Sequence, residues 1–448
     1  MKVRNWIPYG DIVSHQNVTD EALNVFSNSV SVNDLIKAIG EYHNRSIFQQ
    51  VFPWNVVSIT SLDVDKKWRE YLQTIKWAPI SDENFARLQD ISTTCNNVLE
   101  KIKKPNNFTL LSFISTKTAQ ELWRCLNNSW VHVPNLGKEK EIELANSKIF
   151  LRENFSKYMV KWLNVTLPND REELELFLKE HKSKDGKVLL RLPRSVSWLW
   201  IRFLLEDGKE KTSENDIYLH ELCILSDQLW ERQILAEKLL PEDSFESPNV
   251  VWYIDNNWNV DIFGVTEQLL ENKQHQWNYF NPENEKIYSY LSSISKEIAE
   301  KIYKKLWVIG YFWLDFLIVD IRKLDDNIRY FDEDFDTFFW EKAIVLVEIN
   351  FRINGWMPLS WTRNLEQLEI KDKFLSIINT EEIKKWLSSE DVFSILEKEN
   401  LLVKPWSDKT QLWVIPVTIL TWKLQYIIVA NNIEQIREYR QKVKKLLA

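Results

Sequence analysis

Residues 347–352 read Val347-Glu348-Ile349-Asn350-Phe351-Arg352, a regular alternation of apolar and polar side chains that is typical of a β-strand. Successive side chains of a strand point to opposite faces, so Glu348, Asn350 and Arg352 share one face of a sheet. In the preceding apolar run, from Tyr311 to Val319, Asp315 is the single charged residue. A lone carboxylate there is costly unless it meets a cation. The two stretches predict neighbouring strands that present a charged site.

Three of these side chains have the chemistry of a metal site. Asp315, Glu348 and Asn350 offer two carboxylates and an amide oxygen, hard ligands that magnesium takes alongside substrate phosphates and water. Arg352 can bind phosphate oxygens through two parallel hydrogen bonds. The alternative is that Asp315 and Glu348 lie on an exposed sheet face and pair with lysines. The regular alternation of the whole set favours the metal site.

The arrangement resembles the ATP-grasp superfamily, whose pattern ends in a strand with Asp followed by Glu-x-Asn-x-Arg. The resemblance implies an α+β fold in which two lobes grip ATP and magnesium, with manganese as an alternative ion. It places Asp315, Glu348 and Asn350 on the metal and Arg352 on the phosphates. It also implies that an α/β domain precedes the ATP-grasp domain.

Other segments resemble the nucleotide-binding parts of that superfamily, in the same order along the chain. Ser147-Lys148, followed by Arg152, resembles the lysine that opens the ATP-binding lobe. Glu237 resembles the hinge residue that holds adenine and ribose. Arg191, where lysine is usual, precedes a segment that resembles the lid loop, Ser195-Val196-Ser197-Trp198-Leu199-Trp200. The implied cofactor-binding residues are Lys148, Arg191, Ser195, Ser197, Trp198 and Glu237, and the implied catalytic residues are Arg191 and Arg352.

More closely, the chain resembles the pheganomycin-type peptide ligases, through Glu246-Ser247-Pro248-Asn249-Val250, Thr266-Glu267-Gln268-Leu269 and the stretch from Leu412 to Ala430. This implies an ATP-dependent ligase that joins a small carboxylic acid to an amine, either of them an amino acid or peptide. The reaction would pass through an acyl phosphate and release ADP and phosphate. Where that family has Gly-Gly-Thr-Thr-His-Pro, this chain has Gly355-Trp356-Met357-Pro358-Leu359, so the histidine is missing and we expect a different acceptor.

Two other functions stay open from the sequence. One is another ATP-grasp reaction, such as carboxylation, although the sequence carries no biotin or coenzyme A feature. The other is a catalytically silent module that binds a nucleotide. ADP release that depends on an acid and an amine would separate the ligase from the silent module.

The length of 448 residues predicts two or three domains. We expect an α/β pre-ATP-grasp domain over residues 1–145 and the ATP-grasp domain over 146–370, with lobes of about 146–245 and 246–370. A small α+β domain should follow over 371–448. Apolar periodicity predicts a long helix over 283–306 and a closing helix over 433–447, and Asn256-Asn257-Trp258 predicts a hairpin turn.

Composition and charge limit the partners. The formal net charge of −8 argues against a protein that binds nucleic acid by neutralising phosphates. The longest uncharged apolar run, Thr410 to Trp422, is shorter than the roughly 18 residues that cross a bilayer, and the amino terminus lacks a secretory pattern. We therefore expect a cytoplasmic protein without a membrane partner, in which a homodimer is one expected assembly. Cys95, Cys125 and Cys223 are predicted to be separate core thiols.

The counts of tryptophan and glycine are abnormal. Tryptophan occurs 22 times and glycine 8 times, and together they reach about the 7% that glycine alone usually contributes. Several tryptophans also stand where turns need glycine. The hypothesis is that UGA codons are read as glycine in the native cell; the alternative is a protein that is naturally rich in tryptophan. The positions predicted to be glycine are Trp198, Trp200, Trp258, Trp313 and Trp356.

Overall fold

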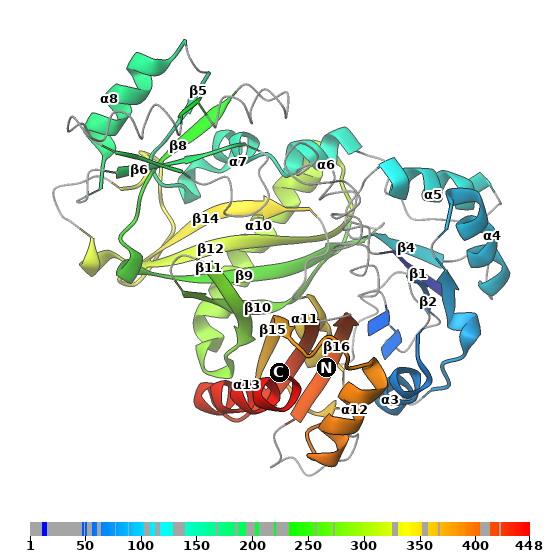
Figure 1. Ribbon diagram of the computed structural model, residues 1–448. Coiled ribbons are helices and arrows are strands. Elements are labelled where there is room, and N and C mark those ends of the chain that lie inside the picture. Colours follow the sequence, from blue (N-terminus) through cyan, green and yellow to red (C-terminus); the bar gives the residue numbers. More distant parts are fainter. Residues whose placement is uncertain are drawn as a thin grey trace.

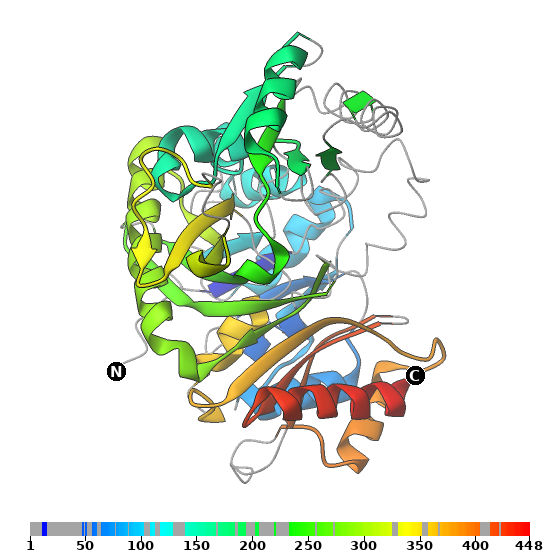
Figure 2. The same ribbon diagram turned by 90° about the vertical axis from the view of Figure 1, so that its left-hand side faces the viewer.

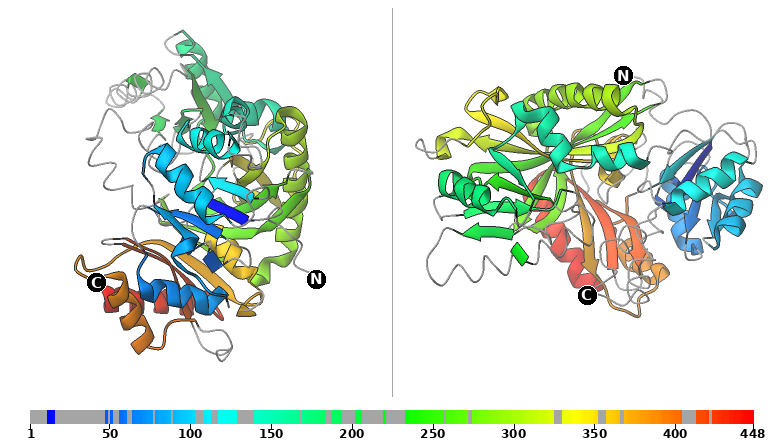
Figure 3. Two further views of the ribbon diagram at one scale, coloured as in Figure 1. Left: turned by 90° about the vertical axis from the view of Figure 1, so that its right-hand side faces the viewer. Right: turned by 90° about the horizontal axis from the view of Figure 1, so that it is seen from above.

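A computed structural model gives the structure of the chain, and three sheets with their helices make up the described part. The described residues are 11–15, 47–48, 50–51, 56–60, 64–76, 78–87, 89–102, 108–112, 117–128, 139–166, 169–183, 187–193, 202–205, 219–220, 233–255, 258–271, 274–324, 330–351, 357–365, 368–403, 413–420 and 423–448. Seen from above, the N-terminal region stands at one end of the central sheet and a small lobe at the other (Figure 3).

The N-terminal region is a parallel α/β sheet, as the sequence predicts. Its strand order is β3-β2-β1-β4, and every neighbouring pair is parallel. The strands are β1 (Asp11–His15), β2 (Val56–Thr60), β3 (Phe85–Arg87) and β4 (Phe108–Ser112). The helices are α3 (Lys66–Lys76), the 3-10 turn η2 (Asp82–Asn84), α4 (Ile91–Lys101) and α5 (Lys117–Asn128), with α4 and α5 packed together in Figure 1.

Two cysteines of this region form a disulfide. Cys95 of α4 and Cys125 of α5 are bonded, with their Cα atoms 6.3 Å apart. The prediction of three separate thiols is wrong for this pair, because the two helices lie side by side and bring distant positions together. Cys223 lies outside the described residues.

A small antiparallel lobe follows, in strand order β5-β8-β6-β7. Its strands are β5 (Trp162–Val165), β6 (Lys187–Arg191), β7 (Arg202–Leu205) and β8 (Ile234–Lys238). The helices α6 (Glu139–Ala145) and α7 (Lys148–Phe155) and the 3-10 turn η3 (Ser156–Tyr158) lead into it, and α8 (Arg171–His181) packs on β5 and β6. Leu174 and Phe177 of α8 bury their apolar face against Val188 and Ala236.

The central sheet has nine antiparallel strands in the order β13-β14-β12-β9-β10-β11-β15-β17-β16. Their bounds are β9 (Phe245–Ile254), β10 (Val260–Glu271), β11 (Gln274–Phe280), β12 (Gly310–Asp320), β13 (Phe338–Phe339), β14 (Lys342–Asn350), β15 (Phe374–Glu382), β16 (Trp413–Leu420) and β17 (Lys423–Ala430). The predicted hairpin of β9 and β10 and the predicted pairing of β12 with β14 are confirmed.

Amphipathic helices cover this sheet and bury their apolar faces against it. The predicted long helix is α10 (Glu285–Leu306), which packs on β9 and β10 through Leu291, Ile298 and Ile302. Figure 2 shows α13 (Ile433–Leu447) lying along the C-terminal strands. The remaining elements are α11 (Met357–Arg363), α12 (Ser389–Lys398) and the 3-10 turns η5 (Glu242–Ser244), η6 (Pro282–Asn284) and η7 (Ile321–Lys323). Among the described residues, no helix has the length and hydropathy of a membrane span.

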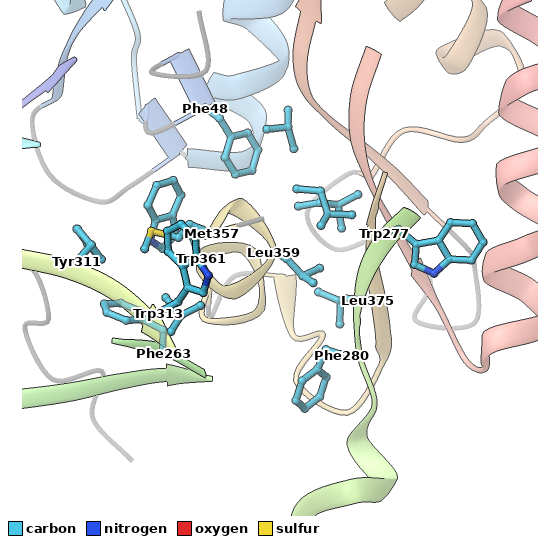
Figure 4. Close-up of a cluster of buried hydrophobic side chains, with 14 of the residues drawn as sticks. Phe48, Phe263, Trp277, Phe280, Tyr311, Trp313, Met357, Leu359, Trp361 and Leu375 are labelled. Carbon is cyan, nitrogen blue, oxygen red and sulfur yellow. The ribbon is translucent and has the colours of Figure 1, made fainter. Parts of the chain in front are cut away.

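One hydrophobic core joins the N-terminal region, the central sheet and the C-terminal strands. Phe48, Trp361 and Ile427 belong to the same buried cluster, and Figure 4 shows Phe48 beside the group that contains Met357 and Trp361. Because β15 pairs with β11, the predicted boundary at residue 370 separates strands that are neighbours in one sheet. The division into three domains stays a prediction.

Candidate active site

The three predicted metal ligands meet on two neighbouring strands. Asp315 of β12 is the cross-strand partner of Glu348 of β14. Asn350 lies two residues beyond Glu348 on the same face, and its Nδ2 donates to Glu348 Oε1 at 2.8 Å and to Asp315 Oδ2 at 3.1 Å. The alternation seen in the sequence therefore brings these three side chains into one cluster.

Helix α7 adds two buried cations to this cluster. Ser147 begins the helix as its N-cap by accepting a hydrogen bond from the Phe150 backbone N–H, and Lys148 and Arg152 share one face at a spacing of four residues. Lys148 Nζ lies 3.3 Å from Glu348 Oε2. Arg152 Nη2 lies 3.5 Å from the carbonyl oxygen of Val347. The helix is thus tied to β14 beside the carboxylates.

Glu237 joins the same set of charges from the small lobe. It lies on β8 diagonally opposite Arg191 of β6, whose Nε donates to Glu237 Oε2 at 2.7 Å. The other carboxylate oxygen, Oε1, forms an ion pair with Arg152 Nη2. Glu237 is 1% exposed, and arginines contact both of its carboxylate oxygens in the protein interior. Ribose or adenine would therefore have to compete with these arginines for the carboxylate.

Burial disfavours the charges on the three cations. It lowers the pKa of Lys148, against the neighbouring carboxylate of Glu348, which raises it. Burial also lowers the pKa of Arg191, and that of Arg152, on which the charge of Arg191 acts in the same direction. Positive charges held together at such a cost are stabilised when an anion such as a phosphate group arrives.

The chemistry of the donor set fits magnesium. Asp315 and Glu348 provide carboxylate oxygens, and Asn350 provides an amide that could turn its oxygen towards an ion held between them. Within the described residues, no group of three or more histidine, cysteine, aspartate or glutamate side chains could hold a metal. This site would use two such side chains, with the amide as the third ligand.

Four predicted site residues, Arg352, Ser195, Ser197 and Trp198, lie outside the described residues. The structure brings the other six together, which are Lys148, Arg191, Glu237, Asp315, Glu348 and Asn350.

Two further residues were not assigned a role from the sequence. Arg152 of α7 contacts Glu237 of β8 and the Val347 carbonyl of β14. In the sequence it is recognisable only as the residue that follows Lys148 in the lysine motif, without a role of its own. Gln268 of β10 donates its Nε2 to Asp315 Oδ1 at 2.9 Å. In the sequence, Gln268 follows Thr266 by two residues on a strand, so the two side chains share a face. Its hydrogen bond to Asp315 joins two strands that are not neighbours, and no spacing along the chain predicts it.

We expect Gln268→Leu to raise the magnesium concentration that gives half-maximal ATP turnover by roughly 10- to 100-fold, because a residue that orients a metal ligand affects metal affinity by about this factor. Gln73→Leu is the matched control, since Gln73 donates to the carbonyl oxygen of Ile80 at 2.7 Å in the N-terminal region. An unchanged magnesium requirement in Gln268→Leu would show that Gln268 does not orient Asp315 for a metal.

No protein-family model and no curated protein matches the sequence significantly.

Solved structures match the chain over nearly its whole length at low identity. One is the N5-carboxyaminoimidazole ribonucleotide synthetase from Thermus thermophilus, with 10% identity, 98% of each chain covered and a TM-score of 0.51. The biotin carboxylase domain of the Hydrogenobacter thermophilus 2-oxoglutarate carboxylase has 12% identity over 99% of this chain and 91% of that chain, with a TM-score of 0.51. The biotin carboxylase from Campylobacter jejuni has the same identity and TM-score, over 99% and 93% of the two chains. At these identities the likeness concerns the fold, which is the ATP-grasp fold.

Proposed function

We propose that the protein is an ATP-dependent carboxylate–amine ligase that acts through an acyl phosphate. The observation that carries the proposal is the cluster in which Asp315, Glu348 and Asn350 lie beside the buried cations Lys148, Arg152 and Arg191. One side offers hard oxygen ligands for magnesium, and the other offers positive charge for phosphate oxygens.

A carboxylate does not condense with an amine near neutral pH because its oxygen is a poor leaving group. Attack of the carboxylate on the γ-phosphorus of ATP forms an acyl phosphate and breaks the bond to ADP. Attack of the amine then releases phosphate, which carries away one oxygen of the acid. Such chemistry needs positioning and charge stabilisation and no nucleophilic side chain of the protein.

Each described residue has a part in that scheme. Asp315, Glu348 and Asn350 would hold magnesium, which supplies charge neutralisation between phosphate oxygens when it is bound. Lys148 and Arg191 would bind the transferring phosphoryl group, and Gln268 and Arg152 would position the residues that they contact. Arg352, Ser195, Ser197 and Trp198 remain proposed phosphate and lid residues on the sequence resemblance.

The peptide-ligase resemblance suggests amino acids or peptides as substrates. Met357, where that family carries its histidine, begins α11 and is fully buried in the core. A buried thioether offers neither charge nor a proton to an acceptor, so we propose an acceptor different from that of the better-matched ligases. We also propose that the protein is located in the cytoplasm and forms a homodimer.

Protein isolated from its own cells should form ADP from ATP and magnesium only when a suitable carboxylic acid is present, and faster with an amine. Hydroxylamine should trap the activated acid as a hydroxamate. The panel should contain amino acids, dipeptides and bicarbonate, since one structural neighbour was determined with a bicarbonate anion.

Three results would contradict the ligase. Acid-independent ATP hydrolysis without any hydroxamate would point to another ATPase reaction. ADP formation stimulated by bicarbonate alone would favour a carboxylase. Nucleotide binding without turnover for every member of the panel would favour the silent module.

A further inference from the structure

Tryptophan occupies backbone conformations that side chains avoid. Five described residues other than glycine have a positive φ, and three of them are Trp258 (65°), Trp307 (55°) and Trp340 (56°). A residue with a Cβ atom is strained in this left-handed region, and the strain is least for asparagine, aspartate and glycine. Of the three positions, only Trp258 is also predicted to be glycine from the sequence alone.

Trp307 follows the last residue of a helix, a position that is usually occupied by glycine. It follows the last residue of α10 with φ 55° and ψ 37°, and its backbone N–H donates to the carbonyl oxygen of Tyr303 at 2.8 Å. A left-handed residue that closes a helix in this way is usually glycine, because no Cβ opposes the conformation. Its indole is left 54% exposed.

The other two positions are turns between antiparallel strands. Trp258 lies between β9 and β10, and its N–H donates to the carbonyl oxygen of Asp255 at 3.1 Å. Trp340 lies between β13 and β14, and it is 80% exposed. Tight hairpin turns favour glycine at positive φ. An indole in water gains little from burial, so little offsets the strain at Trp340.

A fourth tryptophan lies inside the candidate site. Trp313 of β12 is 3% exposed, and its Nε1 donates to Asp315 Oδ2 at 3.0 Å. The indole therefore engages an oxygen that the proposed function assigns to magnesium. Glycine at this position would remove the competing donor, a consequence that rests on the proposed function.

We infer that the native protein carries glycine at Trp258, Trp307, Trp313 and Trp340, because UGA codons at these positions are read as glycine in its own cell. The backbone conformations of three residues support this independently of the counts of tryptophan and glycine. The chain with tryptophan is then a mistranslated form in which the site and several turns carry indoles.

Mass spectrometry of the protein isolated from its own cells tests the inference without any assay of activity. Trypsin releases residues 306–322 as one peptide, which contains Trp307, Trp313 and the ordinary glycine Gly310. We expect this peptide to be lighter by two tryptophan-to-glycine differences, with fragment ions that place glycine at both positions. Tryptophan at both would overturn the inference and leave the exposed ring contacts of Trp258, Trp307 and Tyr303 as a native surface.

The thermal stability of the recombinant chain that carries tryptophan provides a second, independent test. We expect Trp340→Gly to raise the melting temperature by roughly 1–2 °C, and Trp340→Ala, which also lacks the indole but keeps Cβ, to raise it less. Trp68→Gly is the opposing control, because Trp68 is buried on α3 against Phe393 and should lose stability. A Trp340→Gly chain less stable than the tryptophan chain would contradict the inference. Failure of the ligase proposal would leave both readings unaffected.

Discussion

Glu348→Gln is expected to lower magnesium-dependent ATP turnover about a hundredfold or more while the fold remains intact. The substitution keeps the shape of the side chain but removes the charge that faces Lys148 and the proposed ion. The Glu348 side chain is 27% exposed, and glutamine has nearly the same size, so the substitution leaves no cavity in the core. The assay is ADP formation from ATP with a carboxylic acid and an amine that support turnover, made on a chain with glycine at residues 198, 200, 258, 307, 313, 340 and 356.

Glu246→Gln is the matched control for this substitution. Glu246 lies on β9 of the same sheet and pairs with Lys342 at 3.4 Å on the surface. It should keep the turnover of the parent chain. Equal turnover in Glu348→Gln and Glu246→Gln would show that the cluster on β12 and β14 does not bind the metal.

The second large effect is on stability. Glu237→Gln should lower the free energy of unfolding by about 3–5 kcal/mol, the usual cost of removing one partner from a buried ion pair. The substitution leaves Arg152 and Arg191 buried without a carboxylate between them. Chemical denaturation of the Glu237→Gln and Glu333→Gln variants measures the difference in their free energies of unfolding. Glu333→Gln is the control, because it changes an exposed carboxylate near Lys161.

A double substitution separates charge balance from packing. Adding Arg152→Met to Glu237→Gln removes the excess positive charge. The double variant should therefore lose less free energy of unfolding than the sum of the two single losses. Additive effects, or a Glu237→Gln chain as stable as Glu333→Gln, would mean that the arginines do not depend on Glu237.

The elements that follow from local pattern were predictable. The closing helix begins at Ile433, where the Asn432 side chain accepts a hydrogen bond from the Gln435 N–H, and it ends at Leu447 as the periodicity indicates. Glu348 and Asn350 were predicted to share a face because a strand alternates. Such features depend on neighbours within a few residues.

Features that depend on distant partners could not be predicted. Strand β15 went unrecognised, and its place in the central sheet comes from pairing with β11, about a hundred residues earlier. The Arg152–Glu237 pair likewise joins α7 to β8, and Gln268 reaches Asp315 across the sheet. No spacing in the sequence encodes these distances, because they follow from how the strands are ordered.

Transfer of oxygen from the acid to phosphate distinguishes an acyl phosphate from an acyl adenylate. The active acid is labelled with ¹⁸O in its carboxylate and allowed to react with ATP, magnesium and the amine, and the phosphate released is examined by ³¹P NMR. If an acyl phosphate forms, we expect one ¹⁸O atom in the phosphate for each amide bond formed. Label in AMP, or phosphate free of label while the amide forms, would contradict it.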